Sequence, residues 1–456
     1  MTDSKSLVKQ AGELADNGQP DAAMEICNRV LLDEPDNVSA IYVAACVMLD
    51  AARHTQAIQM AKRCAELKPR DPRGWGLLSL CYGELSRYDE SIQYAEKALA
   101  LRRDCKTLAD IAYAHTNAGN WEQADRLSLD AIKLATGDES ALGKDAMRQA
   151  LVSQAYIRLA YKDWQAGFEG FRRTMRTKWR KEREYTGPDG QVTKEWTGEA
   201  DATLIVTGEQ GLGDEIMAAS MVPDACDAVK TFVLDCDARL APLFKRSFPK
   251  AIIAPNRRDD AVRIPVMPTH HKTLFGLGEV LRKADWDFPR EAYLKPREDY
   301  IAMFKALLDA PTIGIAYSGG LPRTGMEQRK AGLNAMLPLI RSHPECKFVS
   351  LEYKDDAEEV AAFHKNWGHK ILRFPWVTQS PDMDLLAGLL AACDSVVGVH
   401  TSALHVAAAC GVPTTFICHR GSGWRYAPDE LLWYPPSTKL HRKRPGESWR
   451  EAVGRL

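Results

Sequence analysis

The segment VVGVHTSALHVAAACGVPTTFIC, Val396–Cys418, predicts two strands joined by a short helix. Its predicted elements are, in order, a strand, a helix and a second strand: Ser395–Val399, Ala403–Cys410 and Thr414–Cys418. Thr401 or Ser402 is a favourable N-cap for the helix, and Gly411 and Pro413 end it. A strand, helix and strand in so short a segment indicate a parallel α/β sheet.

Two histidines, His400 and His405, lie at the start of the predicted helix. Zinc ligands on a helix are spaced four residues apart, whereas these two are five apart and His400 precedes the cap, so a metal site is not expected. Parallel sheets bind ligands at the carboxyl ends of their strands. Thr401, Ser402 and His405 are therefore predicted to surround a helix N-terminus, which favours an anion.

Beyond Asp201 the chain alternates between short β-rich runs and helical patterns, as in a doubly wound sheet. The predicted strands are Ala202–Thr207, Thr231–Asp235, Thr312–Ser318, Lys347–Glu352, Ser395–Val399 and Thr414–Cys418. Candidate site residues are those that follow these runs, because the carboxyl ends of parallel strands share one edge of the sheet.

The glycine-rich loop GEQGLGD, Gly208–Asp214, follows the first of these strands. Its glycines do not match GxGxxG, so the loop is not a strong indication of NAD binding. It still leads into a helix N-terminus, whose N–H groups suit an anion or a sugar hydroxyl. Asp214 fits a general base beside the cleft or a helix cap, and spacing alone favours the cap.

A second polar loop, SGGLPRTGMEQRKAGL, follows the third strand. Small residues followed by cations suit a diphosphate, because hydroxyl and amide donors orient it and cations neutralise it. An exposed loop with scattered charge fits the pattern equally well. The candidates are Ser318, Gly319, Arg323, Arg329 and Lys330. At the end of the next strand, Glu352 is either an acceptor for ribose hydroxyls or an exposed charge.

The N-terminal third is periodic. The motifs GQPDAA, ARHTQA, SRYDES and GNWEQA begin at Gly18, Ala52, Ser86 and Gly119, at offsets of 34, 34 and 33 residues, each flanked by apolar-periodic helices. This period resembles tetratricopeptide repeats. A fifth, degenerate unit is predicted at 151–179, with Ala166 as its small residue. Such units bury their faces by stacking, so we expect an α-solenoid whose groove binds a peptide or acceptor, or which acts as a spacer.

A basic connector follows the repeats. Its cations are Arg172, Arg173, Arg176, Lys178, Arg180, Lys181 and Arg183. A polyanion site fits this cluster, but a solvated helix face is favoured. The turn Gly187–Gly190 marks its end. The predicted domains are the repeats (1–145), the degenerate repeat with the connector (146–200), and two α/β halves (201–300 and 301–456).

Composition narrows the class of protein. The chain has 456 residues, enough for two to four domains, and its 45% apolar content is that of a globular protein. The 60 basic and 61 acidic residues nearly cancel, so overall charge gives no argument for nucleic acid binding. No signal-type segment or membrane span is predicted, and the eleven cysteines lack a CxxC pair. A cytoplasmic protein with reduced thiols and no zinc site is expected.

The motifs GEQGLGD, YSGG, VSLE and HTSALHVAAACGVPT, followed by GWRY and WYPPSTKLHR, resemble the family 9 (heptosyltransferase-like) glycosyltransferase domain over about Thr203–Arg450. The resemblance implies a GT-B arrangement, in which one Rossmann-like half binds the acceptor and the other binds a nucleotide-sugar donor. No obligatory metal and no cofactor are implied. The expected fold is thus a tetratricopeptide α-solenoid followed by two Rossmann-like α/β halves.

The same resemblance implies roles for individual residues. It makes Asp214 the candidate catalytic base, in a reaction that inverts the sugar's configuration. Acceptor-side loop positions are Glu209, Gln210, Gly211 and Gly213. Donor-side candidates are Ser318, Gly319, Arg329, Lys330, Glu352, His400, Thr401, Ser402, His405, Trp424 and Arg425. Trp424 and Arg425, with Tyr426, either line the donor pocket or form a packed corner between the halves.

His400 departs from the family pattern, since many members have an acidic residue there. The acceptor-side half, about 201–297, is also short for a GT-B domain, and the repeats are expected to complete its cleft through the aromatic residues around Trp164 and Trp179. Expected partners are a nucleotide-diphosphate sugar, an acceptor glycan, protein or modified nucleobase, a protein in the repeat groove, and a second copy of the chain. The alternatives are a non-catalytic scaffold and a nucleic-acid-modifying transferase.

Overall fold

The computed structural model describes residues 3–85, 87–172, 183–257, 263–320, 326, 329–419 and 421–456. The chain forms two compact units. The first contains Met1–Ile157 with two short segments, Gly320–Gln328 and Gly421–Gly423, and the second contains Arg158–Gly319, Arg329–Arg420 and Trp424–Leu456. The division falls inside one helix, α9 (Ala141–Ala160).

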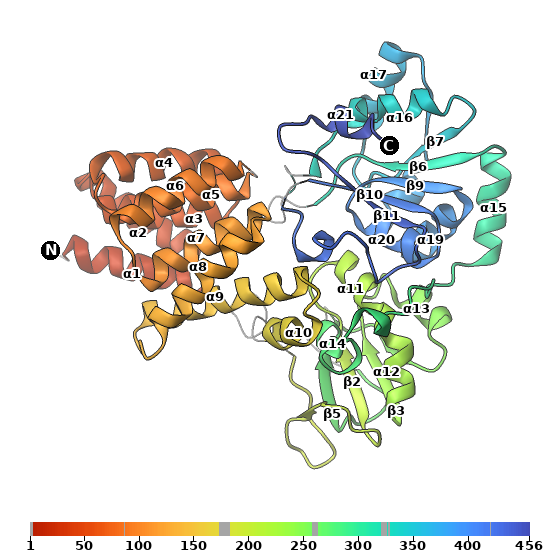
Figure 1. Ribbon diagram of the computed structural model, residues 1–456, viewed down its shortest axis with the longest axis horizontal. Coiled ribbons are helices and arrows are strands. Elements are labelled where there is room, and N and C mark those ends of the chain that lie inside the picture. The colour runs from red at the N-terminus through yellow and green to blue at the C-terminus, as the bar shows by residue number, and fades with distance from the viewer. Residues whose placement is uncertain are drawn as a thin grey trace. The chain divides into compact units, whose positions relative to one another are not determined.

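The first unit is built from consecutive helix pairs, drawn in red to orange in Figure 1. Their bounds are α1 (Ser4–Asp16), α2 (Pro20–Asp33), α3 (Val38–Asp50), α4 (His54–Leu67), α5 (Pro72–Glu84), α6 (Tyr88–Leu101), α7 (Cys105–Ala118) and α8 (Trp121–Ala135). The turn inside each pair coincides with one of the four sequence motifs. The predicted repeats are therefore confirmed.

The first helix of each pair begins at an Asp or Asn N-cap, a signal that recurs with the repeat period. The caps are Asp3, Asn37, Asp71 and Asp104, and each side chain accepts a backbone N–H from the first turn at 2.8–3.1 Å. Such a cap satisfies one of the donors that a helix start leaves unpaired and contributes about 1 kcal/mol.

Small residues allow the two helices of each pair to approach one another. They are Ala11, Ala45, Ser79 and Ala112 in the first helices and Ala23, Ala57, Ser91 and Ala124 in the second, and none is more than 2% exposed. In the third pair, the two serines satisfy each other, because Ser91 Oγ donates to the Ser79 carbonyl oxygen at 2.8 Å. Larger side chains at these positions would separate the helices.

The degenerate fifth unit consists of the end of α9 and α10 (Trp164–Arg172). Its predicted small residue was wrong by one position: Ala166 is exposed, whereas Gly167 is buried. A Cβ at Gly167 would lie 2.7 Å from the Leu159 side chain and 2.9 Å from its backbone nitrogen. Gly167 lies five positions after Lys162, whose backbone is left-handed (φ 62°). The small residues Ala23 and Ala57 lie at the same distance after the left-handed residues Gly18 and Ala52, so Gly167 is the equivalent position.

Helix α10 belongs to the second unit and packs against α14 (Gly278–Leu281). Trp164 Nε1 donates to Asp285 Oδ1 at 2.8 Å, and Lys162 Nζ lies 2.8 Å from Asp285 Oδ2. The degenerate repeat is thus fastened to the first α/β half through Trp164. Trp179 lies outside the described residues, and completion of an acceptor cleft by the repeats stays a prediction.

The first α/β half contains a parallel sheet with strand order β1-β5-β2-β3-β4. The strands are β1 (Lys194–Glu195), β2 (Thr203–Thr207), β3 (Thr231–Asp235), β4 (Ile252–Ala254) and β5 (His270–Thr273). Leu204, Ile205 and Val206 of β2 are fully buried, as expected for a strand covered on both faces. Each such side chain contributes roughly 1.5–3 kcal/mol by burial.

The second half contains a parallel sheet with strand order β11-β10-β9-β6-β7-β8. The strands are β6 (Thr312–Ala316), β7 (Lys347–Ser350), β8 (Ile371–Arg373), β9 (Ser395–Val399), β10 (Thr414–Cys418) and β11 (Thr438–Arg442). From the other edge this is the dinucleotide-fold order, third, second, first, fourth, fifth and sixth. The predicted fold class, a repeat solenoid followed by two Rossmann-like halves, is confirmed.

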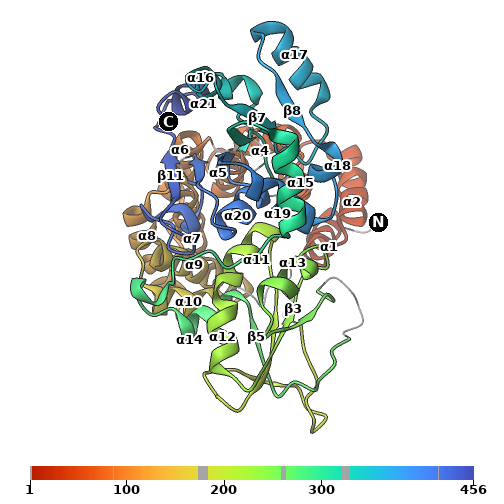
Figure 2. The same ribbon diagram turned by 90° about the vertical axis from the view of Figure 1, so that its right-hand side faces the viewer.

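The helices of the α/β halves follow the same alternation. They are α11 (Leu212–Ala218), α12 (Val222–Ala228), α13 (Ala241–Ser247), α15 (Glu298–Leu308), α16 (Leu337–Ser342), α17 (Ala357–Trp367), α18 (Pro375–Thr378), α19 (Met383–Ala392), α20 (Ser402–Ala409) and α21 (Trp449–Val453). Figure 2 shows α12 and α13 beside the first sheet, where they contact β3 and β4. Helix α20 packs on β9 and β10 and also against α11 of the first half.

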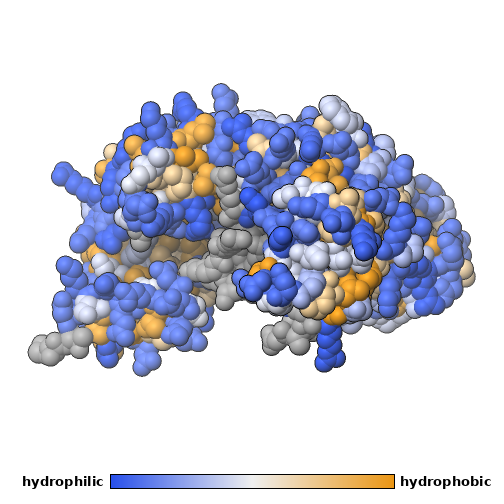
Figure 3. Space-filling model, turned by 90° about the horizontal axis from the view of Figure 1, so that it is seen from below, coloured by the Kyte–Doolittle hydropathy of each residue, from blue (hydrophilic) through white to orange (hydrophobic). Residues whose placement is uncertain are grey.

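Polar side chains cover most of the face seen in Figure 3, with apolar residues scattered among them. No helix in the described ranges combines the length and the apolar character needed to cross a membrane. All eleven cysteines are described, and none forms a disulfide.

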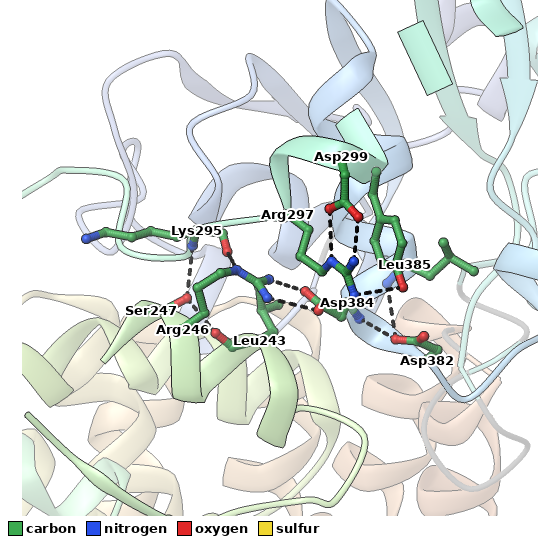
Figure 4. Close-up of polar contacts among 10 residues, drawn as sticks. Leu243, Arg246, Ser247, Lys295, Arg297, Asp299, Asp382, Asp384 and Leu385 are labelled. Atoms are coloured by element: carbon green, nitrogen blue, oxygen red, sulfur yellow. Dashed lines mark hydrogen bonds and ion pairs between the residues drawn. The ribbon is translucent and has the colours of Figure 1, made fainter. Parts of the chain in front are cut away.

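A partly buried ion pair joins the two α/β halves (Figure 4). Arg246 of α13 binds both carboxylate oxygens of Asp384 on α19, with Nη1 3.0 Å from Oδ2. The Arg246 Nε also donates to the Lys295 carbonyl oxygen at 2.6 Å, in the segment that leads from one half to the other. The Asp384 side chain is only 7% exposed, so this two-point pair is shielded from water.

Replacing Ala57 with Leu should lower the free energy of unfolding by about 1–3 kcal/mol, because the added carbons have no space at the helix crossing. Urea unfolding followed by circular dichroism measures this change. Gln59→Leu on the exposed face of the same helix is the control, with a change within about 0.5 kcal/mol. Equal effects of the two substitutions would contradict the proposed crowding.

A double-mutant cycle with Arg246→Ala and Asp384→Ala should give a coupling energy of about 1–3 kcal/mol. The matched control is the cycle for Arg297 and Asp299, an exposed pair in the same region (Figure 4), for which about 0–1 kcal/mol is expected. Both are measured by urea unfolding. A coupling for Arg246 and Asp384 no larger than that of the control would show that the pair does not hold the halves together.

Candidate functional site

The candidate site lies where strand order reverses in each sheet. The reversal points are β2 beside β5 in the first half and β6 beside β9 in the second. In parallel α/β sheets the loops at such a point diverge in opposite directions, and ligands bind in the crevice outside the carboxyl ends of the strands. The glycine loop follows β2 and the segments from Ser318 and His400 follow β6 and β9, as the sequence predicted. Contact between α11 and α20 brings the two sets together.

Asp214 is the third residue of α11 and has two partners. Its Oδ2 accepts the Gly211 N–H at 3.2 Å, so the capping role favoured by spacing is present. Its Oδ1 lies 2.5 Å from Arg425 Nε of the second half, and the two side chains are 25% and 17% exposed. The carboxylate is therefore at the junction of the halves and partly open to solvent.

Gln210 adopts a left-handed backbone conformation with φ 63°. Its carbonyl oxygen accepts from Arg257, and its Oε1 accepts from Arg425. Glu209, also in the predicted acceptor-side loop, is buried and accepts the Phe275 N–H through Oε1 at 3.1 Å. The loop is thus held by internal contacts on several sides.

Glu215, on α11, supports this loop through Arg257. The sequence analysis did not predict a role for it. It is fully buried, it pairs with Arg257, and its Oε1 accepts the Asp237 N–H at 2.9 Å. Burial raises the pKa of Glu215 to about 7, against the opposing effect of the Arg257 cation. Only its place beside Asp214 in the sequence could have indicated a role.

His405 is packed at the interface of the halves. Its Nδ1 is 2.6 Å from the Tyr434 hydroxyl and its Nε2 is 2.8 Å from the Tyr426 hydroxyl. A Cβ at Gly213 would lie 2.7 Å from His405 Cδ2, so this glycine lets the two halves meet. Burial lowers the pKa of His405 to about 4. The predicted phosphate contact would have to replace one of the tyrosine hydrogen bonds.

Glu352 is buried and has internal partners at both carboxylate oxygens. Its Oε1 accepts the N–H groups of Tyr317 and Ser318, each at 2.8 Å, and its Oε2 accepts from Ser318 Oγ. The side chain is 3% exposed, and burial raises its pKa. The alternative of an exposed charge is therefore wrong, whereas the ribose contact stays a prediction. Glu352 positions Ser318.

Thr401 is the N-cap of α20, and Ser402 is the first helical residue. A Cβ at Gly319 would lie 2.7 Å from Thr401 Cγ2, so the β6 and β9 loops are in contact. Arg329 Nη1 donates to the His400 carbonyl oxygen at 3.3 Å, which brings this cation to the same edge. Lys330 is exposed to solvent.

Two polar atoms at this edge are buried without a hydrogen-bond partner in the described part of the chain. They are Nε2 of His400 and Oγ1 of Thr401, and the cap therefore has no side-chain hydrogen bond. The His400 ring lies 4.7 Å from the ring of Tyr426, and burial lowers its pKa well below the usual value. A neutral imidazole and a hydroxyl are thus available where the sequence predicted donor contacts.

Trp424 is in an aromatic cluster, as a packed corner between the halves requires. The cluster contains Trp164, Phe168, Phe171, Phe275, Phe288, Trp424 and Trp433. Trp424 is 2% exposed. The Arg425 guanidinium lies over the rings of Trp424 and Phe275, 4.8 and 5.4 Å from their centroids. In this position it contacts the Asp214 carboxylate.

Cations of the predicted basic connector are only partly described. Arg172 donates to Glu195 Oε2 at 2.7 Å and Arg183 to Asp235 Oδ2 at 2.8 Å, so both have internal carboxylate partners. The remaining connector cations, residues 173, 176, 178, 180 and 181, and Arg323 of the β6 loop lie outside the described residues. Within the described ranges no three or more His, Cys, Asp or Glu side chains are grouped to hold a metal ion.

Comparisons with known proteins give one family-model match and one relative in sequence. Residues 16–98 match the family model described as anaphase-promoting complex, cyclosome, subunit 3. Protein FlbA of Caulobacter vibrioides is 26% identical over 474 residues, which cover 96% of this chain and 75% of FlbA.

Two solved transferases also align with the chain. A mutant Thermobaculum terrenum O-GlcNAc transferase aligns over 99% of this chain and 89% of its own, with 13% identity and a TM-score of 0.40. ADP-heptose lps heptosyltransferase II of E. coli aligns over 55% of this chain and 93% of its own, with 16% identity and a TM-score of 0.39.

Glu215→Gln should reduce the pH dependence of stability. Because the folded-state pKa of about 7 exceeds the ordinary 4.5, the folded chain binds more protons between these values, and stability falls as pH rises through the window. The loss between about pH 5 and pH 7.5 should be smaller in Glu215→Gln by on the order of 2 kcal/mol. Urea unfolding at both pH values measures it. Glu358→Gln, at an exposed position, should keep the parent slope, and a parent slope in Glu215→Gln would refute the assignment.

Proposed function

We propose that the chain is a glycosyltransferase that moves a sugar from a nucleotide-diphosphate sugar to an acceptor hydroxyl. One observation carries the proposal: the partly exposed carboxylate of Asp214, at the start of α11, and two polar atoms of His400 and Thr401 that have no hydrogen-bond partner among the described residues follow the strands at the two reversal points, where α11 and α20 meet. A carboxylate at one strand edge and hydrogen-bonding groups at the other suit a base and an anionic leaving group.

In the proposed reaction the acceptor oxygen attacks the anomeric carbon of the donor sugar and inverts its configuration. Asp214 takes the proton of that hydroxyl, the bond between the anomeric carbon and the phosphate oxygen breaks, and the electron pair leaves with the diphosphate. The N–H groups at the start of α20, with Thr401, stabilise the departing charge, and Arg329 adds a cation beside them. No cofactor enters this scheme.

Arg425 must change partner during the proposed cycle. Asp214 Oδ1 is engaged by the Arg425 guanidinium in the structure, so this oxygen is not free to take the proton of an acceptor hydroxyl. A donor diphosphate that enters between the halves offers Arg425 a second anionic partner, which would leave Asp214 to the acceptor. This exchange orders the reaction, with the donor binding before the acceptor is activated.

The repeats are proposed to bind the acceptor or a partner protein. Stacked helix pairs form an extended surface, and α9 runs from this unit into the unit that holds Asp214. A protein or a glycan on a protein is therefore the acceptor class that this arrangement suits best.

The donor class is tested by thermal shift with UDP, GDP, ADP, CMP and dTDP, since a bound nucleotide stabilises the fold in proportion to its occupancy. Hydrolysis and transfer are then measured with the matching nucleotide sugar. Asp214→Asn should lower the rate about 10²- to 10⁴-fold and keep the nucleotide-induced shift. Asp227→Asn, at an exposed surface pair in the same half, should keep both.

Absence of any nucleotide-induced shift and of hydrolysis in the parent would refute the proposal in favour of a scaffold. Tight binding of DNA or RNA that weakens steeply with salt would favour a transferase acting on nucleic acid.

A further inference from the structure

Gln210 has an unfavourable backbone that its surroundings maintain. Its φ of 63° is in the left-handed region, where a residue with a Cβ is strained. Strain of this kind persists where neighbouring contacts over-determine it, and such positions gather at functional sites. Glycine occupies three other positions of the same loop, Gly208, Gly211 and Gly213. The left-handed position is nevertheless occupied by a glutamine, which has a side chain.

Two arginines fix the position and orientation of Gln210. Arg257, itself paired with the fully buried Glu215, donates to the Gln210 carbonyl oxygen. Arg425 donates to the side-chain oxygen Oε1 and, through Nε, contacts Asp214. Because a guanidinium has no acceptor, it must face the oxygen of the amide, so the orientation of the side chain is determined.

The amide nitrogen that results from this orientation is buried and has no partner among the described residues. A buried N–H left unpaired is destabilising, and folded proteins rarely keep one without a purpose. Nε2 of His400 and Oγ1 of Thr401, on the opposing loop, are in the same condition. Unsatisfied hydrogen-bonding groups thus occur on both sides of the crevice, and on the first side the group is tied through Arg425 to Asp214.

We infer that the Gln210 side chain donates a hydrogen bond from Nε2 to an oxygen of the donor substrate, either of its sugar or of its diphosphate. This inference rests on the proposed transferase function and assigns one more substrate-binding residue to it. Gln210 and Asp214 belong to the same glycine-rich loop, so a donor held by Nε2 lies beside the base. Gln210 thus serves the donor as well as the loop of the acceptor-side half.

Three substitutions separate this role from a structural one. Gln210→Gly relieves the strained backbone and should raise Tm by about 2 °C, while it lowers kcat/KM for nucleotide-sugar hydrolysis about 10- to 100-fold. Gln210→Glu keeps the shape and the acceptor for Arg425 but puts an oxygen where Nε2 was, and it should lower kcat/KM at least as much. Ala52→Gly, also at a left-handed residue but in the repeats, is the matched control and should raise Tm without changing kcat/KM.

Each outcome has a distinct meaning. If the parent is stabilised by a nucleotide of the panel and hydrolyses its sugar, but Gln210→Gly and Gln210→Glu retain kcat/KM within about twofold, this inference fails and the proposed function stands. If the parent shows neither property, both fail. Two outcomes support the inference. If pyrophosphate raises the Tm of Gln210→Glu less than it raises the Tm of the parent, the contact is to the diphosphate. If pyrophosphate raises the Tm of both proteins equally but the nucleotide sugar raises the Tm of Gln210→Glu less, the contact is to the sugar.

Discussion

Arg425 connects the two α/β halves at the edge where their strands end. Its guanidinium contacts Asp214 and Gln210 of the first half and lies over the rings of Trp424 and Phe275. The aromatic rings limit its motion and shield it from water, which strengthens its charged contacts. The orientation of the glycine loop therefore depends on a cation that belongs to the other half.

Buried charges elsewhere in the two halves position backbone and do not face the crevice. Glu215 holds Arg257 and the Asp237 amide, and Glu352 holds the turn at Ser318. A carboxylate removed from water is stable only when its oxygens are fully hydrogen-bonded, so these side chains have little capacity left for a ligand. Among the described residues, the buried polar atoms without a hydrogen-bond partner include neutral ones on Gln210, His400 and Thr401. An anionic or sugar ligand that brings its own oxygens complements such donors.

The repeats obey a different constraint, which is the space at each helix crossing. A buried Ala, Ser or Gly at one position in the second helix of each pair lets the two helices approach. Asp or Asn caps begin the first helix of each pair with the same period. The exception in the third pair, Ser79 with Ser91, keeps its polar atoms bonded to one another. Gly167 extends this constraint into α10, which is packed on the first α/β half.

Local patterns in the sequence were sufficient for the repeat period, for β3, β9 and β10 at their observed bounds, and for a cap of α20 at Thr401 or Ser402, because apolar periodicity and capping act over a few residues. The structure places this cap at Thr401. These patterns also predicted that Asp214 and the loops at Ser318 and His400 lie at the carboxyl ends of the strands, because parallel strands share one edge. The short strands β1, β4, β5 and β8 have two to four residues each, too few to show a pattern, and β11, which has five, contains leucine as its one apolar residue. The partners of each side chain were decided by the tertiary structure alone. Glu352 faces inward, His405 lies between two tyrosines and Arg425 reaches Asp214, because residues distant in sequence meet only when the sheets are assembled.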